Sequence, residues 1–396
     1  MWRLGFFFHE MGYGLLSIFL PLYIISVSPS NGLFYIGVMS AMALFLAIPA
    51  SFFWGYICDK TRHYKRYILI SFLASTIILY LLTLTTSVSW LILLYSIMSI
   101  LHVAHEPPKN VLIAELYSRE DWERSFAFYE GFTEGGWLIG LILGFLTSVY
   151  GFGQVNTLYL CSALNLAAMI LALALVTDPL LIFERGLVSM EKSLDFAHHG
   201  FFLASKLLDG TSVSEKLKKE NLAAFCSGLV LFSLATSILF TPMPIFVSKL
   251  AKEESIVFVI FVLNSGGAVF GYYVAGRRSN QQTGKANIGR IVIFRCFLSF
   301  LLIAALQPVT YNVVLVTSIL ILMGFVYAIF LVHMLSLSME LIPAGKAGLF
   351  NVLIGIGGAC GSFIGPFLGQ AFGFLHVFIT AGVIFLSAYI AFRIFA

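Results

Sequence analysis

The sequence predicts an all-α integral membrane protein with twelve transmembrane helices. Hydrophobic residues make up 60% of the 396 positions and charged residues 11%, and the mean hydropathy is +0.96. A water-soluble domain of this composition would have too little polar surface. Apolar stretches of roughly 20 residues, the length that crosses a bilayer, recur along the whole chain. The basic residues gather in alternate loops between them.

The twelve spans are expected where apolar runs are separated by turn residues or by charges. Uncharged turns such as Ser28–Gly32 and Gly151–Gln154 alternate with charged connections. The expected spans cover residues 5–27, 32–56, 67–86, 90–117, 124–150, 154–177, 222–248, 255–276, 288–307, 312–341, 346–372 and 374–394.

The basic residues lie on one side of the predicted helices. That side carries Lys60 to Arg66, Arg119, Arg124, Arg185 to Lys219, Arg277 to Arg290 and Lys346. The loops of the other side carry Lys249, Lys252, Glu253 and Glu254. Because loops rich in Lys and Arg stay in the cytoplasm, we expect a multi-pass protein of the cytoplasmic membrane, surrounded by the lipid bilayer, with both termini cytoplasmic.

A long polar segment divides the chain into two halves. The predicted domains are six spans within residues 1–177, a cytoplasmic linker with an interfacial helix over 178–221, and six spans within 222–396. The halves repeat landmarks in the same order, which indicates an internal duplication. The pairs are Pro21 and Pro242, Gly55-Tyr56 and Gly271-Tyr272, Glu115 and Glu340, and the series Gly136, Gly140, Gly144 and Gly357, Gly361, Gly365, Gly369.

A short basic stretch between the second and third spans is the most distinctive motif. It contains Gly55, Asp59, Lys60, Arg62, Lys65 and Arg66, and we expect it to form an aqueous gating loop. Gly55 would let two helices approach closely where the loop begins. Asp59 can cap a helix or accept hydrogen bonds from a neighbouring segment, and the basic side chains can face anionic headgroups or a gating carboxylate.

This stretch resembles the signature loop between the second and third helices of the major facilitator superfamily, Gly-x-x-x-Asp-(Arg/Lys)-x-(Gly)-(Arg/Lys)-(Arg/Lys), with His63 near the usual second glycine. Together with the paired landmarks, it makes the chain similar to a transporter of that family over nearly its whole length. The resemblance implies two six-helix bundles related by a pseudo-two-fold axis along the membrane normal. It also implies alternating access to a central substrate cavity lined by spans one, four, seven and ten.

Ionisable residues inside the spans mark the candidate substrate and proton-coupling site, because a charge in hydrocarbon is costly unless it faces water or a partner. The candidates are Glu10, His102, His105, Glu106, Lys109, Glu130, Glu134 and His333. Lys109, Glu134 and Glu10 lie at comparable depths, so a lysine and several carboxylates are expected to meet in the first half. They form either a protonation or substrate-binding cluster or a buried ion pair that locks the helices. In the second half, Arg290 and Arg295 lie near the inner end of the ninth span.

Pro107 and Pro108 directly follow Glu106 in the fourth span. Consecutive prolines remove two amide donors and free carbonyl groups one turn earlier. In lipid such groups must be buried in protein or face a wet cavity. We therefore expect a kink that places His105, Glu106 and Lys109 beside polar backbone. Glu106 and Lys109 are three residues apart on a helix, so they can also pair with each other.

The sequence contains no signature of an enzyme, a cofactor site or a metal site. Gly284-Lys285 is followed by alanine and lacks the nucleotide-binding pattern. His105-Glu106 is followed by two prolines, unlike the motif of a zinc protease. The five cysteines are scattered without metal-ligand spacing, and the net charge of +4 fits lipid-facing cytoplasmic residues. We expect no catalytic residue, no cofactor, no metal and no nucleic-acid partner.

These features predict a monomeric secondary active transporter that works by alternating access. The favoured version is proton-coupled export of a small organic or amphipathic solute across the cytoplasmic membrane. Uptake, by proton symport or by facilitated diffusion, is the alternative within transport. A membrane-embedded sensor and a lipid scramblase are the alternatives outside it.

The predicted orientation is tested by labelling single cysteines in a cysteine-free background. Asn31 lies in a predicted outer loop and Ser279 in a predicted inner loop. With both termini cytoplasmic, a membrane-impermeant thiol reagent labels Asn31→Cys on intact cells and reaches Ser279→Cys only after the membrane is opened. The reversed pattern would contradict the orientation.

Overall fold

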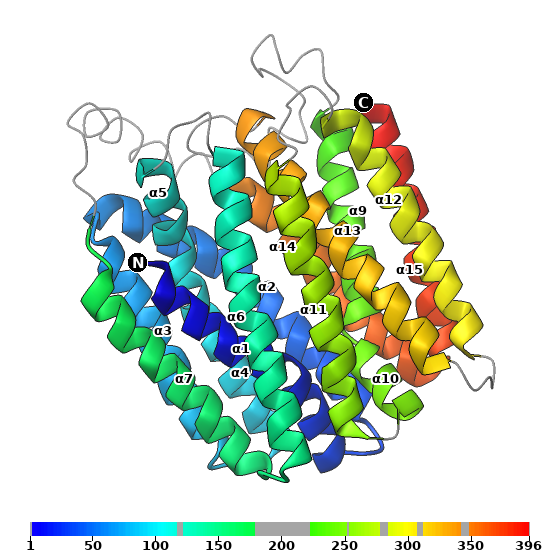
Figure 1. Ribbon diagram of the computed structural model, residues 1–396, viewed down its shortest axis with the longest axis horizontal. Coiled ribbons are helices and arrows are strands. Elements are labelled where there is room, and N and C mark those ends of the chain that lie inside the picture. Colours follow the sequence, from blue (N-terminus) through cyan, green and yellow to red (C-terminus); the bar gives the residue numbers. More distant parts are fainter. Residues whose placement is uncertain are drawn as a thin grey trace.

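In the computed structural model the chain is wholly helical, apart from short connections, over the residues that the structure describes: 2–116, 122–178, 222–251, 253–277, 284–306, 312–341 and 348–395. Twelve helical segments in this part of the chain are long and apolar enough to cross a membrane. Figure 1 shows them packed side by side in one bundle. The prediction of an all-α membrane protein with twelve spans is confirmed.

The first half contains six spans, of which the fourth is interrupted. Its helices are α1 (Arg3–Val27), α2 (Gly32–Thr61), α3 (Tyr64–Leu82), α4 (Val88–His102), α5 (Glu106–Leu116), α6 (Trp122–Val149) and α7 (Gln154–Leu175). The 3₁₀ turn η1 (Val103–His105) joins α4 to α5, and these three elements together form the fourth span.

The second half repeats this order. Its helices are α9 (Leu222–Phe240), α10 (Met243–Ala251), α11 (Glu254–Arg277), α12 (Gly284–Leu301), α13 (Asn312–Leu341), α14 (Gly348–Ala371) and α15 (Phe374–Phe395), with the 3₁₀ turn η5 (Leu302–Leu306) after α12. α9 and α10 form the seventh span and break at Pro242, which has no amide hydrogen to donate. Twelve passes bring the start of α1, the end of α7, the start of α9 and the end of α15 to one end of the bundle, which we call the linker end.

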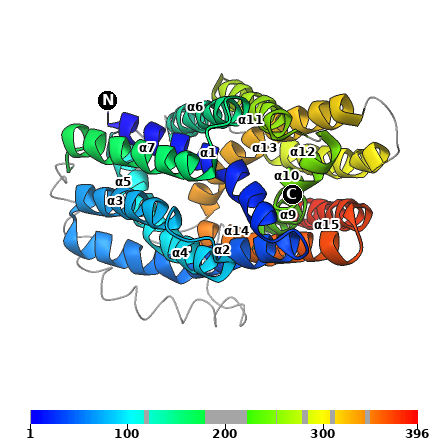
Figure 2. The same ribbon diagram turned by 90° about the horizontal axis from the view of Figure 1, so that it is seen from below.

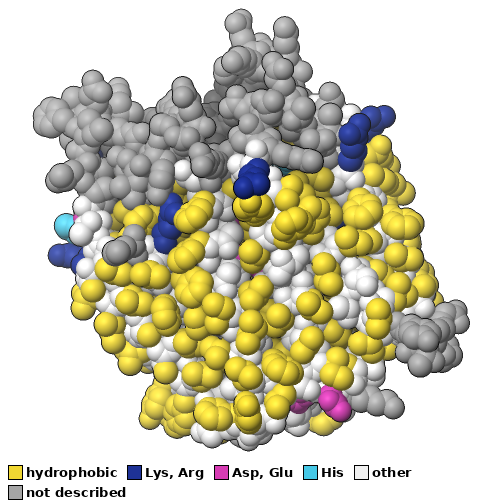
Figure 3. Space-filling model, viewed as in Figure 1, with side chains coloured by type: hydrophobic (Ala, Val, Ile, Leu, Met, Phe, Trp, Pro, Cys, Tyr) yellow, Lys and Arg dark blue, Asp and Glu magenta, His cyan; other side chains and the backbone are white. Residues whose placement is uncertain are grey.

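The outer surface of the bundle is apolar. Figure 3 shows one face covered by hydrophobic side chains, with Lys and Arg near the linker end and acidic side chains at the opposite end. Large side chains such as Phe45, Phe53 and Phe270 are more than half exposed. Such a surface suits hydrocarbon, since the helical backbone already satisfies its own hydrogen bonds. The chain is therefore a multi-pass membrane protein.

Glycines on the fifth and eleventh spans allow close helix packing in both halves. A Cβ added to Gly140 of α6 would collide with the carbonyl oxygen of Met11 in α1. A Cβ added to Gly361 of α14 would collide in the same way with the carbonyl oxygen of Leu234 in α9. The two glycine series thus pack helix against helix, and the internal duplication extends to the tertiary structure.

The two halves meet along two pairs of helices, α2 with α14 and α6 with α11 (Figure 2). At the end opposite the linker end, one apolar core contains residues of both halves, among them Leu33 and Phe246. Toward the linker end, Phe72 belongs to a core of first-half residues and Phe330 to a core of second-half residues. A small cluster around Tyr272 is the exception. The described part of the bundle is therefore fused at one end and largely divided at the other.

The basic stretch is mostly helical, which corrects two expectations. α2 runs to Thr61 and α3 begins at Tyr64, so Arg62 and His63 alone connect them and the non-helical loop is shorter than expected. Arg62 has a φ of 54°, the left-handed conformation that ends many helices. Gly55 does not serve close helix approach, since a Cβ added there would meet no atom within 4 Å.

Lys65 ties the start of α3 to the end of α7. Its backbone N–H donates to Asp178 Oδ1 at 2.7 Å, and its Nζ donates to the Leu173 carbonyl oxygen at 2.6 Å. Lys60 and Arg66 are exposed, as expected of residues that face headgroups or water. The basic stretch therefore contributes both an anchor within the first half and exposed positive charge.

Several expectations concern positions outside the described residues. The linker from residue 179 to 221 is among them, as are Arg119, Arg278 and Lys346, and the side chain of Asp59 is also not described. The gating role of Asp59 and the division of the chain at residues 178–221 stay predictions.

The glycine packing is tested by Gly140→Ala, with Gly55→Ala as the matched control. The new methyl group at Gly140 meets the Met11 carbonyl oxygen, so α1 and α6 must separate at a cost of about 1–3 kcal/mol. The same change at Gly55 meets open space and favours the helix by about 1 kcal/mol. We expect a lower melting temperature for the first variant only. Equal melting temperatures would contradict the packing.

Candidate substrate and coupling site

A cavity of about 460 Å³ lies between the two halves. Its walls come from α2, η1 and α5 in the first half and from α9, α13 and α14 in the second. Spans four, seven and ten line it as expected. No described residue of span one lines this cavity, whereas α2 and α14, which contact each other, both do.

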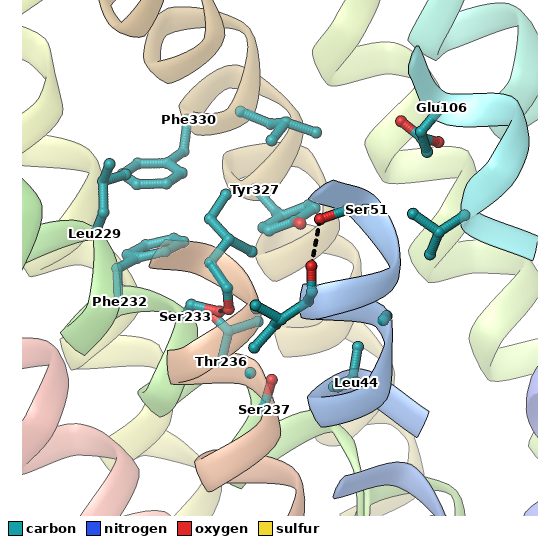
Figure 4. Close-up of a pocket in the computed structure, with 17 residues that line it drawn as sticks. Leu44, Ser51, Glu106, Leu229, Phe232, Ser233, Thr236, Ser237, Tyr327 and Phe330 are labelled. Atoms are coloured by element: carbon teal, nitrogen blue, oxygen red, sulfur yellow. Dashed lines mark hydrogen bonds between the residues drawn. The ribbon is translucent and has the colours of Figure 1, made fainter. Parts of the chain in front are cut away.

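The cavity wall is mainly apolar and aromatic, with a polar edge. Figure 4 shows Phe232, Tyr327 and Phe330 across the cavity from Glu106. Hydroxyl groups come from α2 and α9, at Ser51, Ser233, Thr236 and Ser237. Among the residues that line this cavity, Glu106 is the one that can carry a full charge near neutral pH. The wall therefore suits an amphipathic molecule, and Glu106 gives it one ionisable contact.

Glu106 belongs to a buried cluster of charges. Lys109 is 8% exposed, and its Nζ donates to Glu106 Oε2 at 2.5 Å and lies 3.9 Å from Glu130 Oε1. The same Nζ lies 5.5 Å from the centroid of the Tyr129 ring. One ammonium group thus lies between carboxylates of the fourth and fifth spans. This arrangement offsets the cost of burying each charge.

The predicted kink is present and exposes backbone beside this cluster. At η1 the Glu106 N–H bonds to the Val103 carbonyl, three residues back, instead of the His102 carbonyl, four residues back, which frees the His102 carbonyl. That carbonyl accepts hydrogen bonds from His105 Nδ1 at 2.6 Å and from Ser71 Oγ at 2.8 Å. Pro107, which has no amide hydrogen, follows at once. The carbonyl freed at the kink is therefore hydrogen-bonded by side chains, as burial inside a membrane protein requires.

His105 links this backbone to Glu106 and defines the position of a proton. Its Nδ1 donates to the His102 carbonyl, so its Nε2 is left to face Glu106 Oε1 at 3.3 Å. A neutral Nε2 and a carboxylate oxygen are both acceptors. A stable contact therefore needs one proton between them, on either the imidazole or the carboxyl group. His105 and Glu106 form a pair that can exchange a proton.

A second histidine pair extends from this one into α1. Asn165 Nδ2 donates to the Cys161 carbonyl at 2.9 Å, so its Oδ1 accepts from His9 Nδ1 at 2.6 Å. His9 Nε2 is then the acceptor for His102 Nδ1, 3.0 Å away. The sequence placed His9 in a span but did not select it as a site residue, because its partners come from the fourth and sixth spans.

The three histidines also form a possible ligand set for a metal ion. Nitrogen atoms of His9, His102 and His105 lie within 4.8 Å of one another. His9 uses both nitrogens in hydrogen bonds, and His102 and His105 each use Nδ1. A ring-to-ring hydrogen bond joins His9 and His102, whereas His105 bonds to the backbone carbonyl of His102. An imidazole can accept a proton on one nitrogen and release it from the other, so a relay through all three would need the His102 and His105 rings to come into contact.

The remaining candidates lie in three different places. Glu10 lies within electrostatic range of Glu106 and Lys109. Glu134 does not form the expected pair with Lys109, because Glu130, one turn nearer the linker end, takes that position. Glu134 Oε1 instead accepts a hydrogen bond from Ser265 Oγ of α11 at 2.6 Å, across the contact between the halves. His333 lies in α13 and does not line the cavity.

Arg295 is the residue whose importance the sequence did not indicate. It lies seven residues into the ninth span, Ile288–Leu306, and is completely buried, whereas the sequence suggested a position near the inner end. The number of charges in a span is visible in the sequence. The depth of this one became clear only from the aromatic side chains of α9, α13 and α15 that surround it.

Comparisons with known proteins agree on the fold. The family description "Major Facilitator Superfamily" matches residues 4–354. Two crystal structures, those of the human organic anion transporter MFSD10 and of the nucleoside transporter NupG, each share 15% sequence identity with this chain, at a TM-score of 0.71. Each match covers 99% of this chain and 97% of the other. No curated protein matches the sequence.

The two relatives are named for different cargo, an organic anion and a nucleoside. At 15% identity the similarity shows a shared fold. The cargo of this chain therefore has to be inferred from its own cavity. The fold and the family support a solute transporter in a lipid bilayer and not an enzyme.

The Lys109 cluster is tested by melting temperatures. Lys109→Met leaves Glu106 and Glu130 without their shared countercharge, and breaking a buried pair costs about 3–5 kcal/mol. We expect a large fall in melting temperature near neutral pH, which the double variant Lys109→Met/Glu106→Gln partly reverses. Lys60→Met, the same change at an exposed site, serves as the control and melts like the wild type. A wild-type melting temperature for Lys109→Met would contradict the ion pair.

Proposed function

The chain belongs to the major facilitator superfamily, and from that premise we propose that it is a proton-coupled secondary transporter of a small organic or amphipathic solute. It works by alternating access in the cytoplasmic membrane, and export is the favoured direction. The observation that supports this most strongly is the position of Glu106. This residue lines the cavity and contacts both Lys109 and His105, so its protonation and the content of the cavity influence each other.

The coupling step is a change of partners around Lys109. When Glu106 takes up a proton from His105, it loses its charge and its attraction for the ammonium group. Lys109 Nζ then turns toward Glu130, 3.9 Å away. A neutral Glu106 can donate a hydrogen bond into the cavity, whereas the carboxylate accepts one. Protonation therefore changes which polar groups the cavity can hold.

The hydrogen bonds of the histidines provide a route for the proton. Asn165 orients His9, His9 accepts from His102, and His105 lies between the His102 carbonyl and Glu106. Proton transfer along this chain requires the imidazole rings to rotate or shift. The His102 and His105 rings stand 4.7 Å apart between centroids, close enough for such a rearrangement.

The contact between the halves supports alternating access. The apolar core is shared at the end opposite the linker end and divided toward the linker end. The positive-inside rule places the linker end in the cytoplasm, so the cavity would be loaded from inside. A rocking motion that closes the linker end shifts the two halves against each other. It must therefore break contacts between the halves, such as the hydrogen bond from Ser265 to Glu134. With this expected orientation, the division of the core at the linker end supports export over uptake.

The coupling role of Glu106 is tested by flux in sealed proteoliposomes, with a solute identified by a thermal-shift screen. In the wild type, a pH gradient drives solute accumulation and the solute moves protons in the opposite direction. Glu106→Gln cannot exchange a proton, so we expect it to lose accumulation while it keeps solute exchange at equal pH. Glu134→Gln retains an oxygen that can accept from Ser265 and is expected to keep gradient-driven transport.

Other outcomes would replace the proposal. If the Glu106→Gln variant accumulates solute at the wild-type level, Glu106 has no role in proton coupling. Wild-type flux that ignores the pH gradient would indicate facilitated diffusion, and protons that move with the solute would indicate uptake by symport. Lipid transfer between leaflets without solute flux would indicate a scramblase. The absence of both lipid transfer and solute flux would leave a membrane-embedded sensor as the remaining alternative.

A further inference from the structure

Arg295 is a guanidinium group in the middle of the second bundle with no partner among the described residues. Its exposed fraction is 0%, and no hydrogen-bond acceptor in the described part of the chain lies within reach of Nε, Nη1 or Nη2. A guanidinium carries five N–H donors in a fixed plane and stays charged in proteins. Such a group is costly inside a membrane bundle and marks a functional site.

Four aromatic rings surround this guanidinium and form an aromatic cage. The centroids of Phe232, Phe240, Tyr327 and Phe385 lie 5.0, 5.6, 5.3 and 5.2 Å from Arg295 Cζ. Ring faces attract a cation and lower the cost of its burial. They do not accept the in-plane N–H groups as a carboxylate or phosphate does. The cage therefore holds the charge in place and leaves its donors available.

The cage shares a wall with the cavity. Phe232 and Tyr327 line the cavity on one side and face Arg295 on the other. Thr236, labelled with them in Figure 4, also lines it. Thr236 lies one helical turn after Phe232 and one turn before Phe240, so all three share a face of α9. Its Oγ1 is buried and has no hydrogen-bond partner in the described chain. One unsatisfied donor thus lies at the cavity wall, and the unsatisfied guanidinium lies directly behind the aromatic rings of the same wall.

We propose that Arg295 and Thr236 bind the anionic group of the transported solute, which is therefore an organic monoanion with an aromatic or aliphatic body. This inference rests on the proposed transport function and specifies its substrate class. One guanidinium matches one carboxylate, sulfonate or phosphate monoester through two parallel hydrogen bonds. The hydroxyl of Thr236 supplies a third donor to the same anion.

The rest of the cavity fits the body of such a solute. Phe232 stacks on Phe330 with centroids 3.6 Å apart, and both rings contribute to the apolar wall of the cavity. The volume of about 460 Å³ is in the range of ligand pockets for drug-sized molecules. Rotation of the Tyr327 or Phe232 side chain opens the path from this surface to the guanidinium.

The charges of the two halves also favour this orientation. Glu106, on the opposite wall, repels an anion when ionised and accepts it when protonated. The negative group of the solute is therefore directed toward Arg295, away from Glu106. Binding of the anion in the second half and protonation of Glu106 in the first then favour each other, as coupled transport needs.

The test compares three probes that share one aromatic body and differ in charge: naphthoate, naphthamide and naphthylmethylammonium. Equilibrium binding to the purified full-length protein is measured near neutral pH by the quenching of tryptophan fluorescence. We expect naphthoate to bind the wild type about tenfold or more tightly than naphthamide, and the ammonium probe to bind most weakly. Arg295→Met removes the preference and brings naphthoate to the affinity of naphthamide.

Two further variants keep the test informative if Arg295→Met does not fold. Thr236→Val leaves the guanidinium and its cage in place, and we expect it to weaken naphthoate binding about threefold or more, with naphthamide unchanged. Arg290→Met removes an exposed guanidinium from the same helix and leaves all three affinities as in the wild type.

Clear outcomes would overturn the proposal. Equal binding of naphthoate and naphthamide to the wild type would do so, as would the absence of naphthoate binding. A folded Arg295→Met protein that keeps the preference, or that loses both probes equally, would make Arg295 a structural residue. These measurements use no pH gradient. If the flux assay with Glu106→Gln shows no proton coupling, the proposed anion site is therefore not contradicted. If the binding assay shows no preference for the anion, the proposed proton coupling is not contradicted.

Discussion

The ion pair between Lys109 and Glu106 is the interaction on which the site in the first half depends. An ammonium group that is 8% exposed within a membrane span needs a carboxylate, and two from different spans flank it. The pair also fixes the direction of Glu106, whose other oxygen faces His105. Pro107 has no amide hydrogen for the Val103 carbonyl. The Glu106 N–H bonds to that carbonyl instead, and the His102 carbonyl is left to orient His105. The cost of burying charge and the local break of the helix therefore act together to position the Glu106 carboxyl group beside the cavity.

The internal duplication has preserved packing and changed charge. Gly140 of α6 packs against α1 and Gly361 of α14 packs against α9, through equivalent backbone contacts in the two halves. Such contacts depend on the absence of a side chain, so any larger residue would separate the helices. The charged positions carry no such restriction. The first half has gathered carboxylates, histidines and a lysine, while the second buries a single arginine among aromatic rings. A common scaffold thus carries a cluster of carboxylates, histidines and a lysine at the cavity in the first half and an arginine behind the cavity wall in the second.

The uneven core between the halves links this site to movement. Apolar side chains of both halves are fused at the end opposite the linker end, and they form separate cores toward the linker end. Two packed halves that share an apolar contact at one end can exchange it for a contact at the other with little change inside either half. The Ser265 to Glu134 hydrogen bond crosses this contact. Gly131 of α6 and Gly276 of α11 let the two helices approach closely along this contact.

The sequence by itself determined the class of this protein, its twelve spans and the repeat between its halves. These follow from properties of single segments, namely apolar length, the sign of loop charges and the spacing of glycines. It also located the kink before Pro107, because proline acts on its own backbone. It failed where a role depends on partners from other spans. Gly55 looked like a packing residue and faces open space, Glu134 looked like a partner of Lys109 and bonds to Ser265, and His9 and Arg295 were not selected. Rotation of each helix about its axis decides these contacts, and that rotation is fixed by the packing of all twelve spans together.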